Sequence, residues 1–169
     1  MILSLILSLA LAVSLVVVAS VRERSLPDSI SALVYIFKHK WLWTVWLWLV
    51  TLLTLIPAIE ILSRIGMEFL GFGTLACLVF CGAMPLFDKE HVRWHWITGT
   101  SGCILSQLCV LMISPWWLLS WLLMLLISMC CIAGYNDTDD ECVFQGKGVL
   151  LAECICYLAL MGAMVTKLV

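Results

Sequence analysis

The densest group of residues able to do chemistry lies in the stretch Asp88-Lys89-Glu90-His91-Val92-Arg93-Trp94-His95. In a helix, Asp88, His91 and His95 would project from one face, because residues three and four apart are neighbours there. Imidazole and carboxylate are ligands that zinc takes, so this spacing indicates a zinc site that still lacks a ligand. A plain alternative is that a helix end at the membrane surface carries such residues because water is available there.

Glu153 is the second candidate, since it lies about one and a half turns into an apolar stretch. A charged side chain at the centre of a membrane helix costs about 2.5 to 3.5 kcal/mol on insertion scales. We therefore expect Glu153 to face the interior of the protein and to find a donor there. The predicted polar site consists of Asp88, His91, His95 and Glu153. Further ligands expected on the same side of the membrane are His39, Asp137, Asp139, Asp140 and Glu141.

The composition shows what must position these residues. Of 169 residues, 64% are hydrophobic and only 12% are charged, which a water-soluble domain of this size cannot accommodate. A spanning helix needs about 20 mainly apolar residues. Six stretches approach or meet that length: 2–18, 41–61, 69–87, 94–113, 116–132 and 148–165. The sequence therefore predicts one all-α transmembrane bundle with no soluble domain, because an open sheet would leave backbone groups unpaired in lipid.

Charge and cysteine content exclude two other classes of protein. The formal net charge is -2, so no basic surface is available for nucleic acid. Nine cysteines could suggest a disulfide scaffold, but most lie inside apolar runs, where cysteine behaves as a small hydrophobic residue. We interpret as free thiols Cys77, Cys81, Cys103, Cys109, Cys130, Cys131, Cys154 and Cys156.

The basic residues predict the orientation in the membrane. Seven of nine lie in the connections after the first, third and fifth stretches, and only Arg64 and Lys167 lie on the other side. The positive-inside rule then places those three connections in the cytoplasm and both termini outside. We expect the first helix to be retained rather than cleaved as a signal, because no Lys or Arg precedes its apolar core.

Two connections are long enough to have structure of their own, 21–40 and the acidic loop 134–147. In the first, Leu26, Ile30 and Leu33 fall near one helical face, with Ser25 suited to a cap and Pro27 to a first turn. This pattern predicts a helix along the membrane surface. The alternative is that the second span begins earlier and that Lys38-His39-Lys40 reach to the head groups.

A stripe of small and polar residues continues the face of His95 toward mid-membrane: Thr98, Gly99, Gly102 and Ser106. Small residues let helices approach closely and hydroxyls can pair across them, so the stripe is typical of helix packing. A solvated path would use the same residues. A contact between copies in a homo-oligomer is a further interpretation.

Three short motifs resemble an uncharacterised family of small multi-pass membrane proteins from bacteria and their phages. They are Pro27-Asp28-Ser29-Ile30-Ser31, the stretch Gly82-Ala83-Met84-Pro85-Leu86-Phe87, and His95 followed by Thr98-Gly99. The likeness covers roughly residues 25 to 125. It implies a bundle of six or seven helices and no established activity. It also implies that the Ser29-Ile30-Ser31 segment faces outside, which conflicts with the count of basic residues.

A more distant likeness is to the ceramidase-like membrane hydrolases, whose metal site uses several histidines with Asp and Ser. It implies that Asp88, His91 and His95 would hold the metal. The chain departs from that pattern, because its third histidine is far away in sequence and no serine completes the motif.

These observations predict a bacterial or phage-borne inner-membrane protein in contact with the lipid bilayer and without catalysis. It would bind, sense or pass a small solute or ion at the predicted polar site, where His supplies switchable charge and carboxylates supply cation affinity. One alternative is a membrane-embedded hydrolase acting on lipid, in which zinc activates water. The other is an assembly or effector protein that acts through helix packing.

Overall fold

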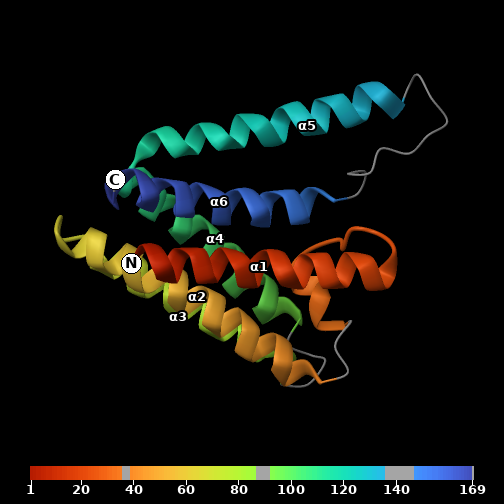
Figure 1. Cartoon of the computed structure of the whole chain (residues 1–169), viewed down its shortest axis with the longest axis horizontal. Coiled ribbons are helices and arrows are strands. Elements are labelled where there is room, and N and C mark those ends of the chain that lie inside the picture. The colour runs from red at the N-terminus through yellow and green to blue at the C-terminus, as the bar shows by residue number, and fades with distance from the viewer. Residues whose placement is uncertain (36–38, 87–91, 136–146, 169) are drawn as a thin grey trace.

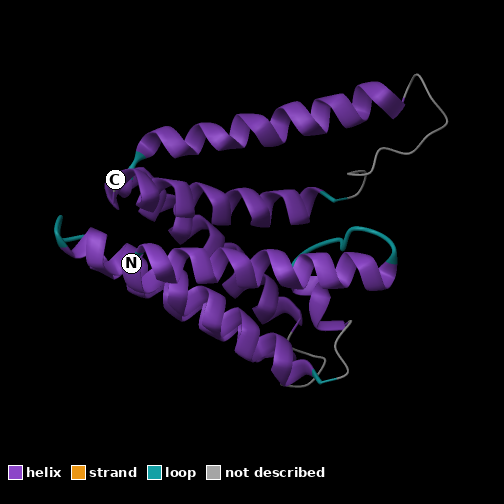
Figure 2. Cartoon of the chain, in the orientation of Figure 1, coloured by secondary structure: helices purple, strands orange, loops and turns teal. Residues whose placement is uncertain are grey.

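The structure, a computed structural model, describes residues 1–35, 39–86, 92–135 and 147–168. Within these ranges most of the chain is helical, short turns and loops join the helices, and no strand occurs (Figures 1 and 2). The α-helices are α1 (Ile2–Glu23), α2 (Lys40–Ser63), α3 (Glu68–Ala83), α4 (Val92–Ile113), α5 (Ser120–Tyr135) and α6 (Gly148–Leu168). Short 3-10 helices are η1 (Ser31–Tyr35), η2 (Met84–Leu86) and η4 (Pro115–Leu119). The predicted all-α bundle is confirmed.

Five helical segments are long and apolar enough to cross a membrane: 2–23, 40–63, 68–86, 93–113 and 148–168. A shorter apolar helix covers Pro115–Ile127. The membrane character of the chain, predicted from its composition, is confirmed at this level. The choice of the inner membrane and of the cytoplasmic side stays a prediction.

Three kinds of residue end the helices. Arg24 has a positive φ of 53° and ends α1 in the left-handed conformation that commonly closes a helix. Gly66, with φ 70°, makes the tight turn between α2 and α3, where glycine tolerates a conformation that other residues resist. Pro115 cannot continue the hydrogen bonding of α4, and the chain turns there into η4.

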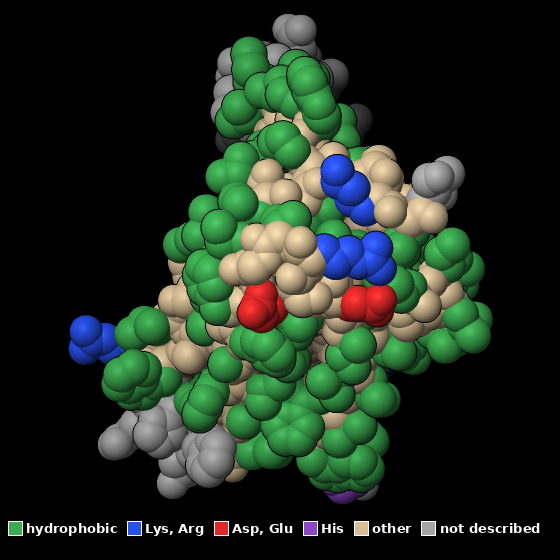
Figure 3. Space-filling view, turned by 90° about the vertical axis from the view of Figure 1, so that its left-hand side faces the viewer, with side chains coloured by type: hydrophobic (Ala, Val, Ile, Leu, Met, Phe, Trp, Pro, Cys, Tyr) green, Lys and Arg blue, Asp and Glu red, His purple; other side chains and the backbone are tan. Residues whose placement is uncertain are grey.

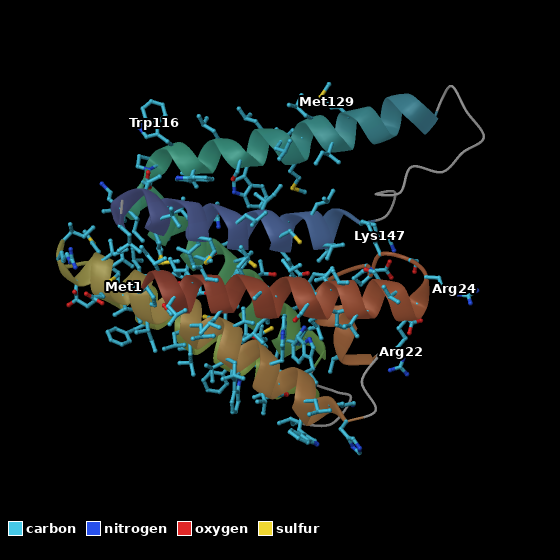
Figure 4. All side chains as sticks on the ribbon, viewed as in Figure 1. Met1, Arg22, Arg24, Trp116, Met129 and Lys147 are labelled. Atoms are coloured by element: carbon cyan, nitrogen blue, oxygen red, sulfur yellow. The ribbon has the colours of Figure 1, made fainter. Side chains whose placement is uncertain are left out.

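The helices alternate in direction, so α2, α4 and α6 begin at the same end of the bundle, which we call the loop end. Figure 4 shows Arg22, Arg24 and Lys147 at this end and Met1 and Trp116 at the opposite one. The opposite end carries acidic and basic side chains in its middle and hydrophobic side chains on its flanks (Figure 3). The pair Glu60–Arg64 there is exposed, at 3.4 Å.

Polar side chains tie α2 to both of its neighbours. The Thr44 hydroxyl donates to the carbonyl oxygen of Gly82 at 2.7 Å, and the Trp48 indole donates to that of Val79 at 3.0 Å, both on α3. On the other side, the Trp46 indole donates to the carbonyl oxygen of Leu11 on α1 at 3.0 Å. Each bond satisfies a side-chain donor inside the bundle, where no water can do so.

A chain of hydroxyls joins α1, α2 and α6 farther inside. Ser8 Oγ lies 2.7 Å from Thr54 Oγ1 and 2.8 Å from the Tyr157 hydroxyl. Thr54 in turn donates to the carbonyl oxygen of Val50 at 2.9 Å. Ser8 is fully buried, as is Leu5 on the same helix. The first helix is thus packed into the bundle as one of its members.

The edge of the bundle is formed by η4 and α5, which contact α6 and α4 (Figure 1). The Trp121 indole donates to Gln107 Oε1 at 3.0 Å, and Gln107 Nε2 donates to the carbonyl oxygen of Cys156 at 3.2 Å. The ring of Trp117 lies against Gly162. Gln107 therefore links α5 to α6 through α4.

The connection between α1 and α2 differs from the prediction. A helix starting at Ser25 or Pro27 is wrong, because the helical residues begin only at Ser31, and the alternative of an earlier start for α2 is wrong too, since α2 begins at Lys40. The physical reason is that the Asp28 carbonyl oxygen and the Ile30 N–H bond to α6, so these two groups do not take part in local helical bonds before Ser31.

Leucine at position 162 should destabilise the bundle, because Trp117 leaves no room there. A Cβ atom on Gly162 would lie 2.5 Å from carbons of the Trp117 ring. Overpacking of this kind costs about 1 to 3 kcal/mol. We expect the Gly162→Leu variant to unfold at a lower temperature than the wild type in detergent.

The matched control is Gly148→Leu on the same helix, where a Cβ atom would meet nothing within 4 Å. Its unfolding temperature should stay close to that of the wild type. Equal losses in the two variants would show that Trp117 does not rest on Gly162.

Candidate functional site

The candidate site is built around residues 28–31, the segment that leads from α1 into η1. The Asp28 carboxylate pairs with the ammonium of Lys147, which is mostly buried. The Asp28 carbonyl oxygen accepts from the backbone N–H of Leu150 at 3.2 Å. That N–H belongs to the first turn of α6, where backbone donors have no partner within the helix. The segment thus caps the start of α6.

Glu153 on α6 accepts hydrogen bonds from the same segment. Its Oε2 accepts a hydrogen bond from the backbone N–H of Ile30 at 2.5 Å, and the carboxylate also accepts from the backbone N–H and the hydroxyl of Ser31. These donors lie at the start of η1, where backbone N–H groups need an outside acceptor. The side chain is partly buried. Glu153 therefore caps the start of η1, as residues 28–31 cap the start of α6.

Trp43 connects this segment to α2. Its indole donates to the Ile30 carbonyl oxygen at 3.3 Å, and its side chain is 1% exposed. It packs in a small core with Ala19, Leu33 and Val34. The segment is thus held by a carboxylate on one side and by an indole on the other.

His95 lies on the far side of Trp43, with their ring centroids 6.1 Å apart. His95 Nδ1 is 3.1 Å from the carbonyl oxygen of Cys81 and 3.5 Å from its Sγ. A carbonyl oxygen only accepts, so this bond requires the proton on Nδ1 and leaves Nε2 of a neutral ring as an acceptor or ligand. The Thr98 hydroxyl donates within α4, to the carbonyl oxygen of Trp94 at 2.8 Å.

Thiols of α3 lie beside His95 where α3 packs on α4. Cys81 Sγ is 3.5 Å from His95 Nδ1, and a Cβ atom on Gly102 would lie 3.4 Å from the Cys77 side chain. Farther along, α4 meets α6, where Gln107 Nε2 donates to the carbonyl oxygen of Cys156 at 3.2 Å. Glu153 and His95, which are far apart in sequence, are therefore linked at the loop end through Ile30 and Trp43.

The other predicted site residues have different places. Asp88 and His91 lie outside the described residues, as do Asp137, Asp139, Asp140 and Glu141. His39 is described; it precedes α2 and is exposed. Among the residues that the structure describes, no three His, Cys, Asp or Glu side chains are placed to hold one metal ion. The predicted zinc site and the hydrolase based on it stay predictions.

The small-residue stripe of α4 lies largely against α3. A Cβ atom on Gly102 would lie 2.8 Å from the Leu78 side chain, and one on Gly99 would lie 3.3 Å from Cys81 Sγ. Ser106 is buried, and Thr98 is partly buried. A shallow depression of about 350 Å³ on α4 is lined by other residues, namely Trp96, Ile97, Thr100 and Ser101.

Sequence reasoning missed three residues of the site. Trp43 is not singled out in the sequence, Cys81 is interpreted only as a free thiol, and Ser31 is named only within a motif. Cys81 carried a weak signal, because it lies one span before His95 at the same predicted end. Trp43 and Ser31 gave no signal that separates them from ordinary interfacial residues.

Comparison of the chain with known protein families, with curated proteins and with solved structures finds no match. The family resemblance of the sequence and the likeness to ceramidase-like hydrolases therefore stay predictions. The site has to be interpreted from its own geometry.

Cys103 and Cys156 should form a disulfide when they are the only cysteines left. Both residues lie where α4 packs against α6, next to the hydrogen bond from Gln107 to the Cys156 carbonyl oxygen. In a variant with the other cysteines replaced by alanine, mild oxidation in membranes should lock the two helices together. A faster-migrating band on a non-reducing gel would report the cross-link.

The control keeps Cys103 with Cys154, two residues away on α6, and should cross-link much less. Equal yields from the two pairs, or none from Cys103 with Cys156, would contradict the placement of α6 against α4.

Proposed function

We propose that the protein binds a small cation at the loop end of the bundle, in the site that contains Glu153 and His95. The observation that carries this proposal is which groups bond to the Glu153 carboxylate. Within the described residues, no Lys or Arg forms an ion pair with its carboxylate. Lys147, the nearest basic residue in the sequence, pairs with Asp28 instead.

The groups that stabilise the charge of Glu153 in this apolar helix are therefore neutral hydrogen-bond donors. Hydrogen bonds from two N–H groups and one hydroxyl stabilise a carboxylate, but they do not neutralise it. A buried charge without a counter-charge is costly, and binding a cation offsets that cost.

Binding at Glu153 would also act on the connection between α1 and α2. A cation on the carboxylate competes with the N–H groups of Ile30 and Ser31 for the same oxygens. Occupancy would loosen residues 28–31 from α6 and leave the Lys147–Asp28 pair as the remaining tie. This coupling supports sensing, because it converts the presence of an ion into movement of a segment at the membrane surface.

Cation binding should raise the thermal stability of the detergent-purified protein. A ligand at about 100 times its Kd adds about 2.7 kcal/mol, which corresponds to a rise of about 5 to 10 °C in a chain of this size. Nitrates of Na⁺, K⁺, Mg²⁺, Ca²⁺, Zn²⁺ and Ag⁺ are tested singly. Choline nitrate serves as the control for ionic strength.

We expect the Glu153→Gln variant to lose the rise, because glutamine keeps the shape of the side chain but not its charge. Glu60→Gln is the matched control, since Glu60 is exposed and paired with Arg64 at the opposite end. If no cation stabilises the wild type, or if both variants respond alike, the proposed function is wrong.

A further inference from the structure

The starts of α2 and α4 carry basic side chains that the proposed cation site does not use. Lys40 is the first residue of α2, Arg93 is the second residue of α4, and both side chains are exposed. Neither forms an ion pair with a residue that the structure describes. Two positive charges at the loop end are therefore available to a ligand.

The acidic side chains described at this end have other partners. Glu23 lies 3.9 Å from the Arg22 guanidinium. Asp28 pairs with Lys147. The Glu153 carboxylate accepts hydrogen bonds at the start of η1. None of these carboxylates neutralises the starts of α2 and α4.

The two basic helix starts lie side by side. The rings of Trp43 on α2 and His95 on α4 are 6.1 Å apart, and hydrogen bonds hold both helices to the last turn of α3. Lys40 lies three residues before Trp43, and Arg93 lies two residues before His95. Two cations that begin from neighbouring turns attract a ligand of net negative charge more strongly than a zwitterion.

Exposed indoles indicate the depth of these residues in the membrane. Trp41, next to Lys40, is 54% exposed, and Trp94, next to Arg93, is 55% exposed. Tryptophan is enriched where the hydrocarbon core meets the lipid headgroups. The two basic side chains therefore lie at the level of the headgroups.

Below Arg93, the outer face of α4 has a hollow that faces the lipid. This depression of about 350 Å³ is lined by Trp96, Ile97, Thr100 and Ser101. These residues follow Arg93 by three, four, seven and eight positions, which places all five on one helical face. Ser101 lies about 12 Å along the axis from Arg93. The hollow thus leads from the headgroup level toward the middle of a hydrocarbon core that is about 30 Å thick.

A phospholipid has the chemistry that this combination requires. The guanidinium of Arg93 can donate two parallel hydrogen bonds to a phosphate, and the ammonium of Lys40 adds a second charge to the same region. An acyl chain laid in the hollow covers the apolar side chains of Trp96 and Ile97. The charge of the two basic residues favours a headgroup with net negative charge over a zwitterionic one.

We propose that the starts of α2 and α4 bind one anionic phospholipid. Arg93 and Lys40 hold its headgroup, and one of its acyl chains lies in the hollow on α4. This inference goes beyond the proposed cation site. It does not involve Glu153, so either proposal can fail without the other.

Native mass spectrometry of the full-length protein in detergent tests the inference. The protein is titrated separately with dioleoyl-phosphatidylglycerol and dioleoyl-phosphatidylcholine, which share their acyl chains and differ in headgroup charge. We expect the wild type to bind the anionic lipid more tightly. Each Lys or Arg near an anionic headgroup contributes about fivefold in affinity. Lys40→Gln with Arg93→Gln should therefore lose about five- to twenty-five-fold in affinity for phosphatidylglycerol.

The matched control carries Arg64→Gln with Lys167→Gln, which removes the same two charges from exposed positions at the opposite end. Its affinity for phosphatidylglycerol should match that of the wild type. Equal losses in the two double variants would overturn the inference. Equal affinities of the wild type for the two lipids would overturn it as well.

A third variant tests the hollow separately from the charges. Thr100→Phe fills the hollow from an exposed position, so we expect it to weaken the binding of both lipids and to keep the preference for the anionic one. Leu111→Phe is the control, because Leu111 is an exposed residue of α4 outside the hollow. Wild-type affinities in Thr100→Phe, or equal losses in the two phenylalanine variants, would overturn the inference.

Discussion

The carboxylate of Glu153, held by backbone N–H groups, is the interaction on which the loop end depends. An apolar helix cannot carry a bare charge, and no helix can leave its first N–H groups without acceptors. Reciprocal hydrogen bonds between residues 28–31 and α6 meet both needs. Glu153 accepts from Ile30 and Ser31 at the start of η1, and the Asp28 carbonyl oxygen accepts from Leu150 at the start of α6. Each of the two segments thus supplies hydrogen-bond acceptors for the first N–H groups of the other.

The same rule governs the polar groups in the rest of the bundle. Indoles and hydroxyls of α2 donate to carbonyl oxygens of α1 and α3, and Gln107 reaches a carbonyl oxygen of α6. Small residues permit these approaches; at Gly82, a Cβ atom would lie 3.0 Å from the Trp48 indole nitrogen. In hydrogen bonds of this kind, the polar groups serve the packing of one helix on another. Glu153 differs from them because its charge is left without a cation among the described residues.

Composition and spacing predicted the all-helical membrane bundle because hydrophobic length is written directly in the sequence. They also singled out Glu153 and His95, since a charge or an imidazole in an apolar run is conspicuous. The partners could not be predicted. The donors to Glu153 include backbone N–H groups more than 120 residues away, and every residue but proline has such a group. The amphipathic pattern after Ser25 was misleading for the same reason. Backbone groups of this segment form hydrogen bonds with α6.

Amide hydrogen exchange at Ile30 and Ser31 tests this account most directly. If Glu153 holds their N–H groups, both amides should exchange slowly in the wild type and much faster in Glu153→Ala, while amides in the middle of α2 keep their rates. Fast exchange of the two amides in the wild type, or rates unchanged by the substitution, would contradict the account.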